Sequence, residues 1–447
     1  MSVGDTIVAQ STPYGYGGIG VVRLSGAKSI KILQAVSKTE EEPTDRTALK
    51  TTILSGKKVI DEVVVICYKN PKSFTGEDVV EISCHGSPFI VESIIQECIN
   101  HGARPAGPGE FTRRAYENGK IDLIQAESIA NTIAASSKAG LYNAMSGLSG
   151  EMSSNIKRTS NTTTSLLSYC EHLLDVSDVD IQKDNITHIR KKLLSINKDL
   201  RKISENYDTC RVLTYGANIV LAGNTNSGKS TLFNSIVGDE RSIVNKAAGT
   251  TRDYVDAKIS ISGVPIKIID TAGLRKSKNE IESSGVNRSV ELVKKADLVL
   301  VVIDIINEKP LQVIDNIEHI NNNTLVVYNK IDLKNNKDYI RKPGSAVYVS
   351  ALKGVGISDL KKYILKKLNV EKIPNKLSGI STPRQYECIR SSLKSLDEAN
   401  NILSKGLQLE LICYELENAL MNINSLLGVD TDDLVLNSMF DEFCVGK

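Results

Sequence analysis

The sequence lacks a strong excess of charge of either sign, and it lacks a long apolar run. Lys and Arg number 55 and Asp and Glu number 53, so the formal net charge is only +2. Any contact with nucleic acid is therefore expected from a local basic patch rather than from the chain as a whole. No apolar run approaches the length that spans a bilayer, and the first five residues lack the apolar core of a signal peptide. We accordingly expect a cytoplasmic protein without a membrane partner.

The cysteines lack the spacing of a metal site or of a disulfide framework. The chain has eight cysteines and no C-x-x-C pair. This scatter favours reduced thiols over disulfides or zinc ligands. A second phosphate loop is also absent, which excludes a tandem GTPase. The composition is ordinary for a globular protein, and the length predicts about three domains.

The sequence is organised around residues 223–230, which read G-x-x-x-x-G-K-S, the pattern of a phosphate-binding loop. An apolar run precedes the loop and an amphipathic helix follows it, so strand, loop and helix occur in the required order. This context favours a phosphate loop over a Gly-rich turn that happens to precede Lys-Ser. Lys229 is expected to reach the outer phosphates, and the Ser230 hydroxyl is expected to bind Mg²⁺. The expected nucleotide contacts in this loop are Asn226, Ser227, Gly228, Lys229, Ser230 and Thr231.

Three further motifs follow apolar runs, as nucleotide-binding motifs at strand ends do. Residues 270–273 read DTAG, which is expected to contact Mg²⁺ and the γ-phosphate. Residues 329–332 read NKID, whose final carboxylate can accept the two hydrogen bonds that guanine, unlike adenine, offers. Residues 350–352 can close over the base. The four motifs in order predict a guanine-nucleotide domain with contacts from Asp270, Thr271, Ala272, Gly273, Asn329, Lys330, Asp332, Ser350, Ala351 and Leu352.

The glutamine that orients water in Ras-like enzymes is missing. Its position directly after the DTAG motif holds Leu274, which is apolar and cannot do this. Backbone carbonyls of residues 245–250 and the Asn226 amide can hold a monovalent cation against the phosphates, where an arginine finger would otherwise point. Glu282 is the candidate for orienting the water, and the alternative is an acidic residue in the first turn of a helix. The expected K⁺ ligands are Asn226, Asn245, Ala247 and Thr250; Thr251 is expected on Mg²⁺, and Asn245, Gly249, Thr250 and Thr251 on the nucleotide.

The pattern changes on both sides of the nucleotide motifs. Residues 1–118 alternate strand-like runs with Gly-rich turns, which predicts a mixed α/β domain. Residues 123–174 and 388–426 have helical periodicity and few breakers, so the nucleotide domain is expected as an insertion in a helical domain. Apolar runs on both sides of Gly263 predict a hairpin with one antiparallel edge strand on a parallel sheet. The expected domains are 1–118 (α/β), 119–212 (helical, first part), 213–372 (Ras-like G domain) and 373–447 (helical, second part).

Two isolated residues have both a functional and an ordinary explanation. His85 stands beside a glycine, where a structural turn residue is favoured over a catalytic base. Cys444 stands near a glycine and the terminal lysine, and a nearby cation lowers a thiol pKa and makes the thiol nucleophilic. Cys444 is therefore a catalytic candidate together with Lys229 and Glu282. The alternative for Cys444 is a buried or idle cysteine.

Taken together, these motifs resemble the MnmE (TrmE) family of tRNA-modification GTPases over essentially the whole chain. The last five residues, FCVGK, are the most distinctive part. One departure is Asn245, which stands where a Thr is common in the family and which can still bind a cation through a backbone or amide oxygen. The segments that carry the resemblance are 73–78 (SFTGED), 108–112 (PGEFT), 118–123 (NGKIDL), 249–253 (GTTRD), 270–275 (DTAGLR) and 443–447 (FCVGK).

The resemblance implies a specific chemistry and specific partners. It implies an N-terminal domain that resembles folate-binding one-carbon enzymes, forms a homodimer and binds 5,10-methylene- or 5-formyl-tetrahydrofolate. It implies that the helical domain delivers Cys444 to that site and that the G domains meet across the dimer, aided by K⁺. An FAD-dependent partner, MnmG, would complete an enzyme that installs an aminomethyl or carboxymethylaminomethyl group at C5 of the tRNA wobble uridine. The residues that match the family's folate-contacting positions are Arg23, Glu81, Lys120 and Lys447.

A second class of function remains open on the sequence. A GTP-dependent switch in ribosome assembly or RNA binding, without one-carbon chemistry, also explains the nucleotide motifs. It leaves residues 1–118 and Cys444 without a role. A purely structural dimeric scaffold fits poorly with four intact nucleotide motifs.

Overall fold

The computed structural model describes residues 4–39, 43–175, 183–238, 255–270, 290–306, 319, 321, 323–333, 346–372, 378–406, 408–429 and 431–446. The chain forms two compact units. Unit 1 contains residues 1–130, 153–161 and 420–447, so it is built from both ends of the chain. Unit 2 contains residues 131–152 and 162–419.

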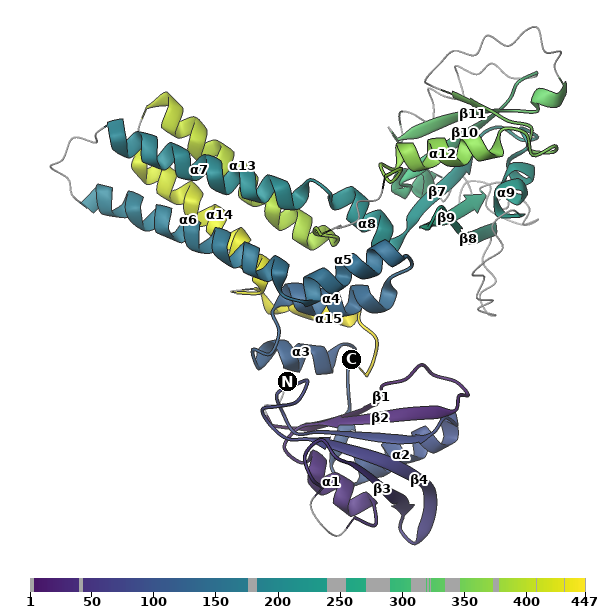
Figure 1. Cartoon of the computed structure of the whole chain (residues 1–447), viewed down its shortest axis with the longest axis vertical. Helices are drawn as coiled ribbons and strands as arrows, with labels where there is room; N and C mark the ends of the chain where they lie inside the picture. The colour runs from purple at the N-terminus through teal and green to yellow at the C-terminus, as the bar shows by residue number, and fades with distance from the viewer. Residues whose placement is uncertain are drawn as a thin grey trace. The chain divides into compact units, whose positions relative to one another are not determined.

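Unit 1 is built on a six-stranded sheet with the order β3-β4-β5-β2-β1-β6, which is antiparallel except for the β1–β6 pair (Figure 1). Along β4 every second residue is buried, because successive side chains of a strand point to opposite faces. The buried side of the sheet packs against α1 and α2, whose apolar residues recur at helical spacing. The elements are β1 (Thr6–Gln10), β2 (Ile19–Ser25), α1 (Ser29–Val36), β3 (Ala48–Ser55), β4 (Lys58–Tyr68), β5 (Val79–His85), α2 (Pro88–Asn100) and β6 (Ala103–Pro105).

The last helix of the chain completes unit 1. Helix α15 (Asp433–Asp441) packs against α3 (Glu110–Glu117) and the start of α4 (Leu123–Ala134), and Leu123 and Phe440 are buried between them. Gly109, which precedes α3, has φ +61, and a Cβ there would lie 2.8 Å from the Phe440 carbonyl oxygen. Only glycine combines this backbone conformation with this close approach. The glycine of the PGEFT segment therefore makes room for the C-terminal helix.

Unit 2 contains a second six-stranded sheet with the order β12-β11-β10-β7-β9-β8. All neighbouring strands are parallel except β8, which pairs antiparallel with β9 at one edge, as the hairpin about Gly263 predicted. β10 is buried along its entire length, which is typical of a central strand covered on both faces. The elements are β7 (Ala217–Ala222), α9 (Lys229–Gly238), β8 (Val255–Ile261), β9 (Val264–Asp270), β10 (Leu298–Asp304), β11 (Thr324–Asn329), a 3₁₀ turn (Ile331–Leu333), β12 (Ala346–Tyr348) and α12 (Ile357–Lys367).

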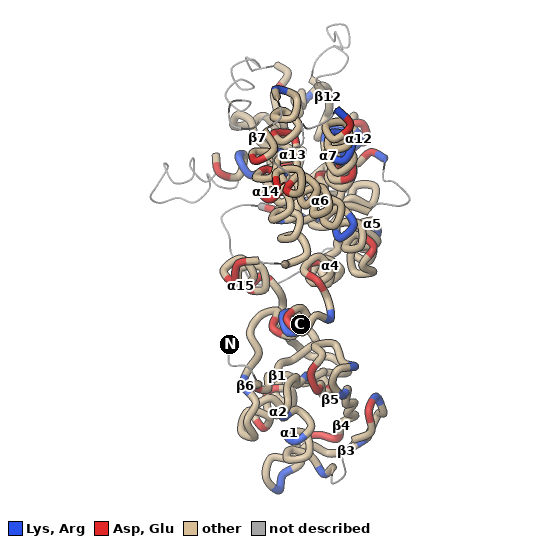
Figure 2. Tube along the Cα trace, turned by 90° about the vertical axis from the view of Figure 1, so that its left-hand side faces the viewer, with Lys and Arg blue, Asp and Glu red and all other residues tan. Residues whose placement is uncertain are grey.

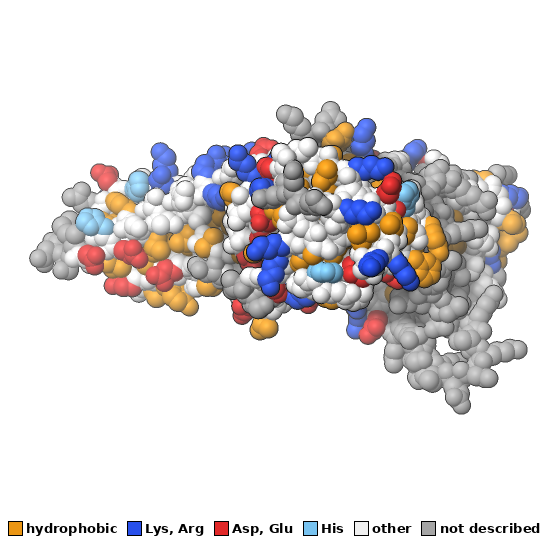
Figure 3. Space-filling view, turned by 90° about the horizontal axis from the view of Figure 1, so that it is seen from below, with side chains coloured by type: hydrophobic (Ala, Val, Ile, Leu, Met, Phe, Trp, Pro, Cys, Tyr) orange, Lys and Arg blue, Asp and Glu red, His pale blue; other side chains and the backbone are white. Residues whose placement is uncertain are grey.

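The remaining helices include two long neighbouring pairs. Figures 1 and 2 both show α7 beside α13 and α6 beside α14. Helix α7 buries a single apolar stripe at i, i+4, i+7 and i+11, so its other sides are exposed. On the side of this bundle seen from below, Asp, Glu and hydrophobic side chains lie together along the left part of Figure 3. The helices are α5 (Lys138–Leu148), α6 (Glu151–Asp175), α7 (Lys183–Ser204), α8 (Tyr207–Tyr215), α13 (Pro383–Lys405) and α14 (Leu409–Leu427).

Residues 123–174 and 388–426, which have helical periodicity throughout, each form more than one helix in the structure. The first break lies between α4 and α5. Ser137 caps the start of α5, because its hydroxyl accepts a hydrogen bond from the Gly140 N–H at 2.9 Å. Gly150, at φ +81, separates α5 from α6, and Gly406, at φ +139, separates α13 from α14. Small and capping residues thus interrupt helices that the apolar pattern alone would join. Among the described residues, no helix is both long enough and apolar enough to cross a bilayer.

Candidate functional site

The nucleotide motifs gather at one edge of the sheet of unit 2. β7 leads directly into the loop at Gly223, β9 ends at Asp270, β11 ends at Asn329, and Ser350 follows β12. These four strands are parallel to one another, so their carboxyl ends lie at the same edge. Ligands of open α/β sheets bind at this edge. The fold therefore places segments up to 127 residues apart, from Gly223 to Ser350, around one location.

The two glycines of the loop sit where no side chain fits. Gly223 has φ +143, and a Cβ there would lie 2.2 Å from the Val302 carbonyl oxygen. Gly228 has φ +90, and a Cβ there would lie 2.3 Å from the side-chain nitrogen of Asn329. Both positions need a backbone conformation and a space that only glycine offers. The loop is therefore wrapped tightly against the neighbouring strand ends.

The start of α9 presents the polar groups of the loop. The Lys229 ammonium donates hydrogen bonds to the carbonyl oxygens of Gly223 (3.0 Å) and Asn224 (2.6 Å). The Ser230 hydroxyl donates to the Asp270 carboxylate at 2.7 Å. The Ser227 hydroxyl is fully buried, and among the described residues it has no hydrogen-bond partner. A buried hydroxyl without a partner costs free energy, which a polar ligand in the loop would offset.

Asn329 connects three of the motifs. Its side-chain nitrogen donates to the Ser227 carbonyl oxygen at 3.0 Å. Its side-chain oxygen accepts from the backbone N–H groups of Lys330 (2.8 Å) and Ala351 (3.0 Å). Asn329 is 2% exposed, and all three bonds lie within one small buried region. The first residue of the NKID motif thus fixes the loop and the residue 350–352 segment relative to each other.

The charged residues of the NKID motif are also held in place. The Lys330 ammonium lies 2.7 Å from the carboxylate of Asp304, the last residue of β10, which is 4% exposed. The Ser350 hydroxyl donates to the Asp332 carboxylate at 2.6 Å. This hydrogen bond lowers the pKa of Asp332 below its ordinary value, so the side chain is ionised at neutral pH. An ionised carboxylate is the group that accepts two hydrogen bonds from guanine.

The remaining expected residues of this site divide into two groups. Asn226 lies in the loop at φ +64, Thr231 lies in the first turn of α9, and the Leu352 side chain is 79% exposed. The other expected residues of the site lie outside the described ones, and they are Asn245, Ala247, Gly249, Thr250, Thr251, Thr271, Ala272, Gly273 and Glu282.

Unit 1 brings Arg23 and Glu81 together on neighbouring strands. β2 and β5 place the two residues opposite each other, and the Arg23 guanidinium donates two hydrogen bonds to one Glu81 oxygen, at 2.7 and 3.0 Å. The guanidinium also lies 5.9 Å from the ring centre of Phe74 and 5.7 Å from that of Phe111. Burial, followed by the Glu81 carboxylate, raises the pKa of Tyr68. A cation, a carboxylate and aromatic side chains thus share one half-buried place.

The other two residues expected beside Arg23 and Glu81 are placed differently. The Lys120 ammonium donates to the carbonyl oxygen of Pro71 at 2.9 Å. Pro71 belongs to the segment between β4 and β5 that also carries Phe74. Lys447 lies outside the described residues.

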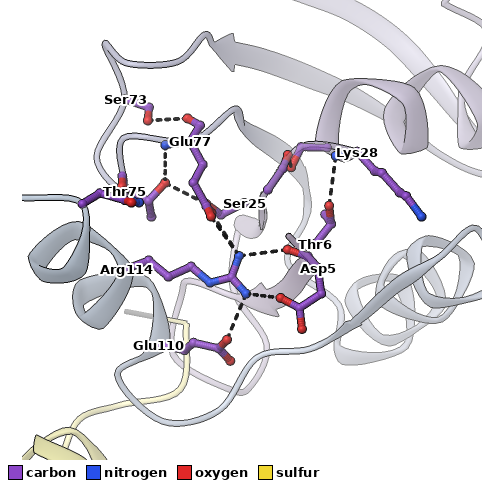
Figure 4. Close-up of polar contacts among 12 residues, drawn as sticks. Asp5, Thr6, Ser25, Lys28, Ser73, Thr75, Glu77, Glu110 and Arg114 are labelled. Carbon is purple, nitrogen blue, oxygen red and sulfur yellow. Dashed lines mark hydrogen bonds and ion pairs between the residues drawn. The ribbon is translucent and has the colours of Figure 1, made fainter. Parts of the chain in front are cut away.

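A partly buried charge network connects several segments of unit 1 (Figure 4). The Arg114 guanidinium contacts the carboxylates of Asp5 (2.6 Å), Glu77 (3.0 Å) and Glu110 (3.1 Å). Arg104 also pairs with Asp5 and Glu110, each at 2.5 Å. Burial alone would raise the pKa of Asp5 and Glu110, but the hydrogen bonds from the two arginines lower it. The network joins the start of β1, the segment before β5 and helix α3.

The chain ends as a short extended segment docked in unit 1. Val445 forms an antiparallel bridge with Pro108, and the Gly109 N–H donates to the Cys444 carbonyl oxygen at 3.3 Å. Cys444 itself is exposed. The Cys444 backbone is therefore bound to Gly109, which precedes Phe111 by two residues in the sequence. The Phe111 ring in turn contacts Arg23.

The surroundings of Gly446 explain why the terminal FCVGK segment has a glycine at this position. It has φ +92, and a Cβ there would lie 2.0 Å from the Gln10 carbonyl oxygen. Its own carbonyl oxygen accepts a hydrogen bond from the Ser11 hydroxyl at 3.1 Å. The terminal segment and the end of β1 approach too closely for any other residue at this position.

Sequence reasoning missed two parts of these sites. Asp304 could have been found, because it ends the apolar run of β10 as Asp270 and Asn329 end theirs. Arg114 carried no comparable signal. Its partners come from three separate segments, and only the folded unit brings them together.

Two models of protein families match the chain. One, described as the N-terminus of the GTP-binding protein TrmE, matches residues 6–120. The other, described as the MnmE helical domain, matches residues 123–444. The two matches together account for nearly all of the sequence.

Several relatives are similar over their full length. A protein of Pseudothermotoga lettingae described as "tRNA modification GTPase MnmE" is 39% identical over 99% of this chain and 100% of its own. A protein of Cytophaga hutchinsonii with the same description is 36% identical over 99% of this chain and 98% of its own. A solved structure of the G domain of the T. maritima FeoB iron transporter is 26% identical over 34% of this chain and 98% of its own, with a TM-score of 0.27.

Proposed function

Because the chain belongs to the family of the tRNA modification GTPase MnmE, we propose that it is a K⁺-stimulated GTPase of tRNA wobble-uridine modification. Together with an FAD-dependent partner of the MnmG type, it uses a tetrahydrofolate one-carbon unit. The product carries an aminomethyl or carboxymethylaminomethyl group at C5 of the uridine. The observation that carries this proposal is the docking of the Cys444 segment beside α3, in the unit that holds the Arg23–Glu81 pair. A simple GTP switch has no use for this arrangement.

The loop residues support GTP as the substrate. The backbone from Gly223 to Gly228 would surround the phosphates of GTP, and the buried Ser227 hydroxyl would gain a hydrogen-bond partner there. Lys229, whose ammonium already lies inside the loop, neutralises phosphate charge. The ionised Asp332 selects guanine over adenine.

Oxygen-bearing side chains support the assignment of Mg²⁺. The Ser230 hydroxyl and the Asp270 carboxylate lie within 2.7 Å of each other, and hydroxyl and carboxylate oxygens suit this hard cation. Ser230 would hold Mg²⁺ together with Thr251. When bound, the ion neutralises charge that develops on the transferred phosphoryl group.

The assignment of K⁺ rests mainly on residues outside the described ones. Asn226, with its amide in the loop, fits the oxygen donors that such an ion needs. Asn245, Ala247 and Thr250 would supply the others. When bound, K⁺ supplies the positive charge that an arginine finger supplies elsewhere. Glu282 remains our candidate for orienting the water.

The Arg23–Glu81 site supports a folate-type ligand. A tetrahydrofolate has a flat heterocycle with hydrogen-bonding edges and an anionic tail, and Phe74 and Phe111 offer apolar faces beside the ion pair. Glu81 would accept from the heterocycle, while Lys120 and Lys447 would hold the anionic part. When bound, the folate supplies the carbon unit, and the docked terminal segment keeps Cys444 near it.

Exposed apolar residues of unit 1 support a homodimer. Tyr14, Tyr16, Ile19 and Phe89 are between 68% and 83% exposed. Large apolar side chains exposed in one region are typical of protein interfaces. We propose that a second copy of unit 1 covers them.

The test is tRNA modification by the purified chain and its FAD-dependent partner. The complete mixture contains tRNA, GTP, KCl and the folate donor, and each component is omitted in turn. We expect the modified wobble nucleoside only in the complete mixture. We also expect GTP turnover to be faster in KCl than in NaCl, by ~10³-fold or more if K⁺ fully replaces an arginine finger.

Two outcomes would contradict parts of the proposal. GTP hydrolysis without any modified nucleoside would favour the switch without one-carbon chemistry. Equal turnover in KCl and NaCl would remove K⁺ from the mechanism. Ser230→Ala serves as the control, because loss of the Mg²⁺ ligand should abolish turnover in both salts.

A further inference from the structure

Helix α7 concentrates positive charge that the proposed chemistry does not use. It contains seven Lys and Arg residues and only two Asp, whereas the whole chain has a net charge of +2. Its buried stripe consists of apolar residues alone, so its cations lie on the exposed sides. A local concentration of this kind is the electrostatic pattern of a polyanion-binding surface.

A groove of about 1140 Å³ lies between α7 and α13. Lys198, Arg201 and Lys202 line it from α7, and Arg390 and Lys394 line it from α13. On each helix, cations recur four residues apart, which is about 6 Å along the axis. Glu205, Asp397 and Glu398 also line the groove, so its five cations outnumber its acidic residues by two.

Three of these cations are available to a ligand. Arg201 is already paired with Asp397 at 2.8 Å, and Arg390 with Glu387 at 3.2 Å. Within the part of the chain that the structure describes, Lys198, Lys202 and Lys394 have no ion-pair partner. Lysines with flexible stems and free ammonium groups are suited to phosphate oxygens.

An aromatic pair lies beside the charges. Tyr386 lines the groove and stacks on Tyr207, with ring centres 4.2 Å apart and an angle of 13° between the rings. Tyr386 precedes Arg390 by one helical turn, so ring and guanidinium share a side of α13. Aromatic side chains next to cations are common in surfaces that bind nucleic acid.

The other long helix pair has the opposite charge. Helix α14 contains Glu410, Glu415 and Glu417 and no Lys or Arg. Figures 1 and 2 place α6 and α14 on the other side of the bundle from α7 and α13. Helix α6 adds Glu151, Glu171 and Asp175 against Lys157 and Arg158, so the α6–α14 side attracts a polyanion less than the α7–α13 side.

We propose that the groove between α7 and α13 binds the phosphate backbone of the tRNA substrate, an inference that rests on the proposed function. The contacts are to phosphates and carry no sequence information, so they position the RNA rather than select it. An acidic partner protein is the competing occupant. Cations that recur one helical turn apart on both walls favour a regularly charged backbone over scattered carboxylates.

The test compares three full-length variants, each with three substitutions. Lys198→Glu, Lys202→Glu and Lys394→Glu together reverse the charge of the groove, and Lys198→Arg, Lys202→Arg and Lys394→Arg keep it. The matched control reverses three exposed lysines of unit 1, Lys31, Lys57 and Lys58. Affinity for tRNA is measured as a function of KCl concentration, and circular dichroism checks folding. Binding of the FAD-dependent partner and tRNA modification are measured with the same proteins.

The proposal predicts a specific pattern among the variants. The Glu variant should bind tRNA at least ~10-fold more weakly near 0.1 M salt, and its log–log salt slope should be shallower by about 2. The Arg variant and the unit 1 control should bind like the unaltered protein.

Each other outcome has a defined meaning. Equal tRNA binding by all variants would contradict the proposal that the groove binds tRNA. Loss of partner binding with unchanged tRNA binding would also contradict it and would identify the acidic protein as the occupant. Modification of tRNA without measurable binding by the unaltered chain also overturns it, because the partner then holds the RNA. Binding lost only in the Glu variant, with no modification by any protein, supports the groove and contradicts the proposed function instead.

Discussion

At the scale of single residues, Asp304 shows how a strand end fixes a motif that lies elsewhere in the sequence. It ends β10, is almost completely buried, and lies 2.7 Å from the Lys330 ammonium. Lys330 itself sits at φ +67, a conformation that needs support from its surroundings. The carboxylate supplies that support by holding the end of the side chain.

Asp304→Asn should therefore weaken guanine-nucleotide binding. The substitution keeps the shape but removes the charge that pairs with Lys330, and a charge-assisted hydrogen bond contributes about 1.5–3 kcal/mol, or roughly 10- to 100-fold in affinity. Fluorescent GDP titration measures this. Asp297→Asn is the matched control, because the Asp297 carboxylate lies 2.6 Å from the Arg211 guanidinium and takes no part in the NKID motif. Equal affinity in the Asp304 variant and the unaltered protein would rule out the role.

Gly446→Ala should release the C-terminal segment. The new Cβ would lie 2.0 Å from the backbone oxygen of Gln10, which cannot move aside as a side chain can. Hydrogen exchange should become faster in the C-terminal peptide, and tRNA modification should fall. Gly102→Ala is the control, because Gly102 has a similar φ of +103 and open space around it. If both variants behave alike, backbone strain rather than the contact with β1 explains the effect.

At the scale of elements, the Arg114 network holds three segments of unit 1 together. Asp5 precedes β1, Glu77 precedes β5, and Glu110 begins α3. The Arg114 side chain is only 9% exposed, so removing it leaves carboxylates poorly paired at a place with little access to water. The segment before β5 also carries Phe74, so the network bears on the Arg23 site as well.

Arg114→Met should loosen unit 1 in a pH-dependent way. We expect local stability to fall by about 2–3 kcal/mol at pH 7, less than for a fully buried pair because Asp5 and Glu77 are partly exposed. The folded-state pKa values of Asp5 and Glu110 are lowered, so their stabilisation is present above about pH 4 and is lost as the pH falls further. The difference between variant and unaltered protein should therefore shrink below pH 4.

Hydrogen exchange of β1 and β5 at pH 7 and pH 3.5 measures this difference. Arg46→Met is the control, because the Arg46 side chain is 55% exposed. A difference that stays constant with pH would show that packing, and not charge, makes Arg114 important.

At the scale of the whole molecule, unit 1 depends on both ends of the chain. Residues 420–447 belong to it together with residues 1–130, and the hydrogen bond from Ser11 to Gly446 joins residues 435 positions apart. The terminal segment is therefore part of the same compact unit as the Arg23–Glu81 pair. The family and the fold class predicted from the sequence are confirmed, whereas the domain boundaries and the roles of individual site residues stay predictions.

The sequence by itself determined the nucleotide motifs and their order along the chain. Such motifs are readable because their geometry is local: Gly223 and Gly228 need their backbone conformation, and Asp270 and Asn329 are the last residues of apolar strands. Only the tertiary structure determined which residues form the Arg114 network, the close contact of Gly446 with β1 and the groove between α7 and α13. Each of these joins segments that are remote in sequence, and no short-range pattern records which remote segments pack together once apolar surface is buried.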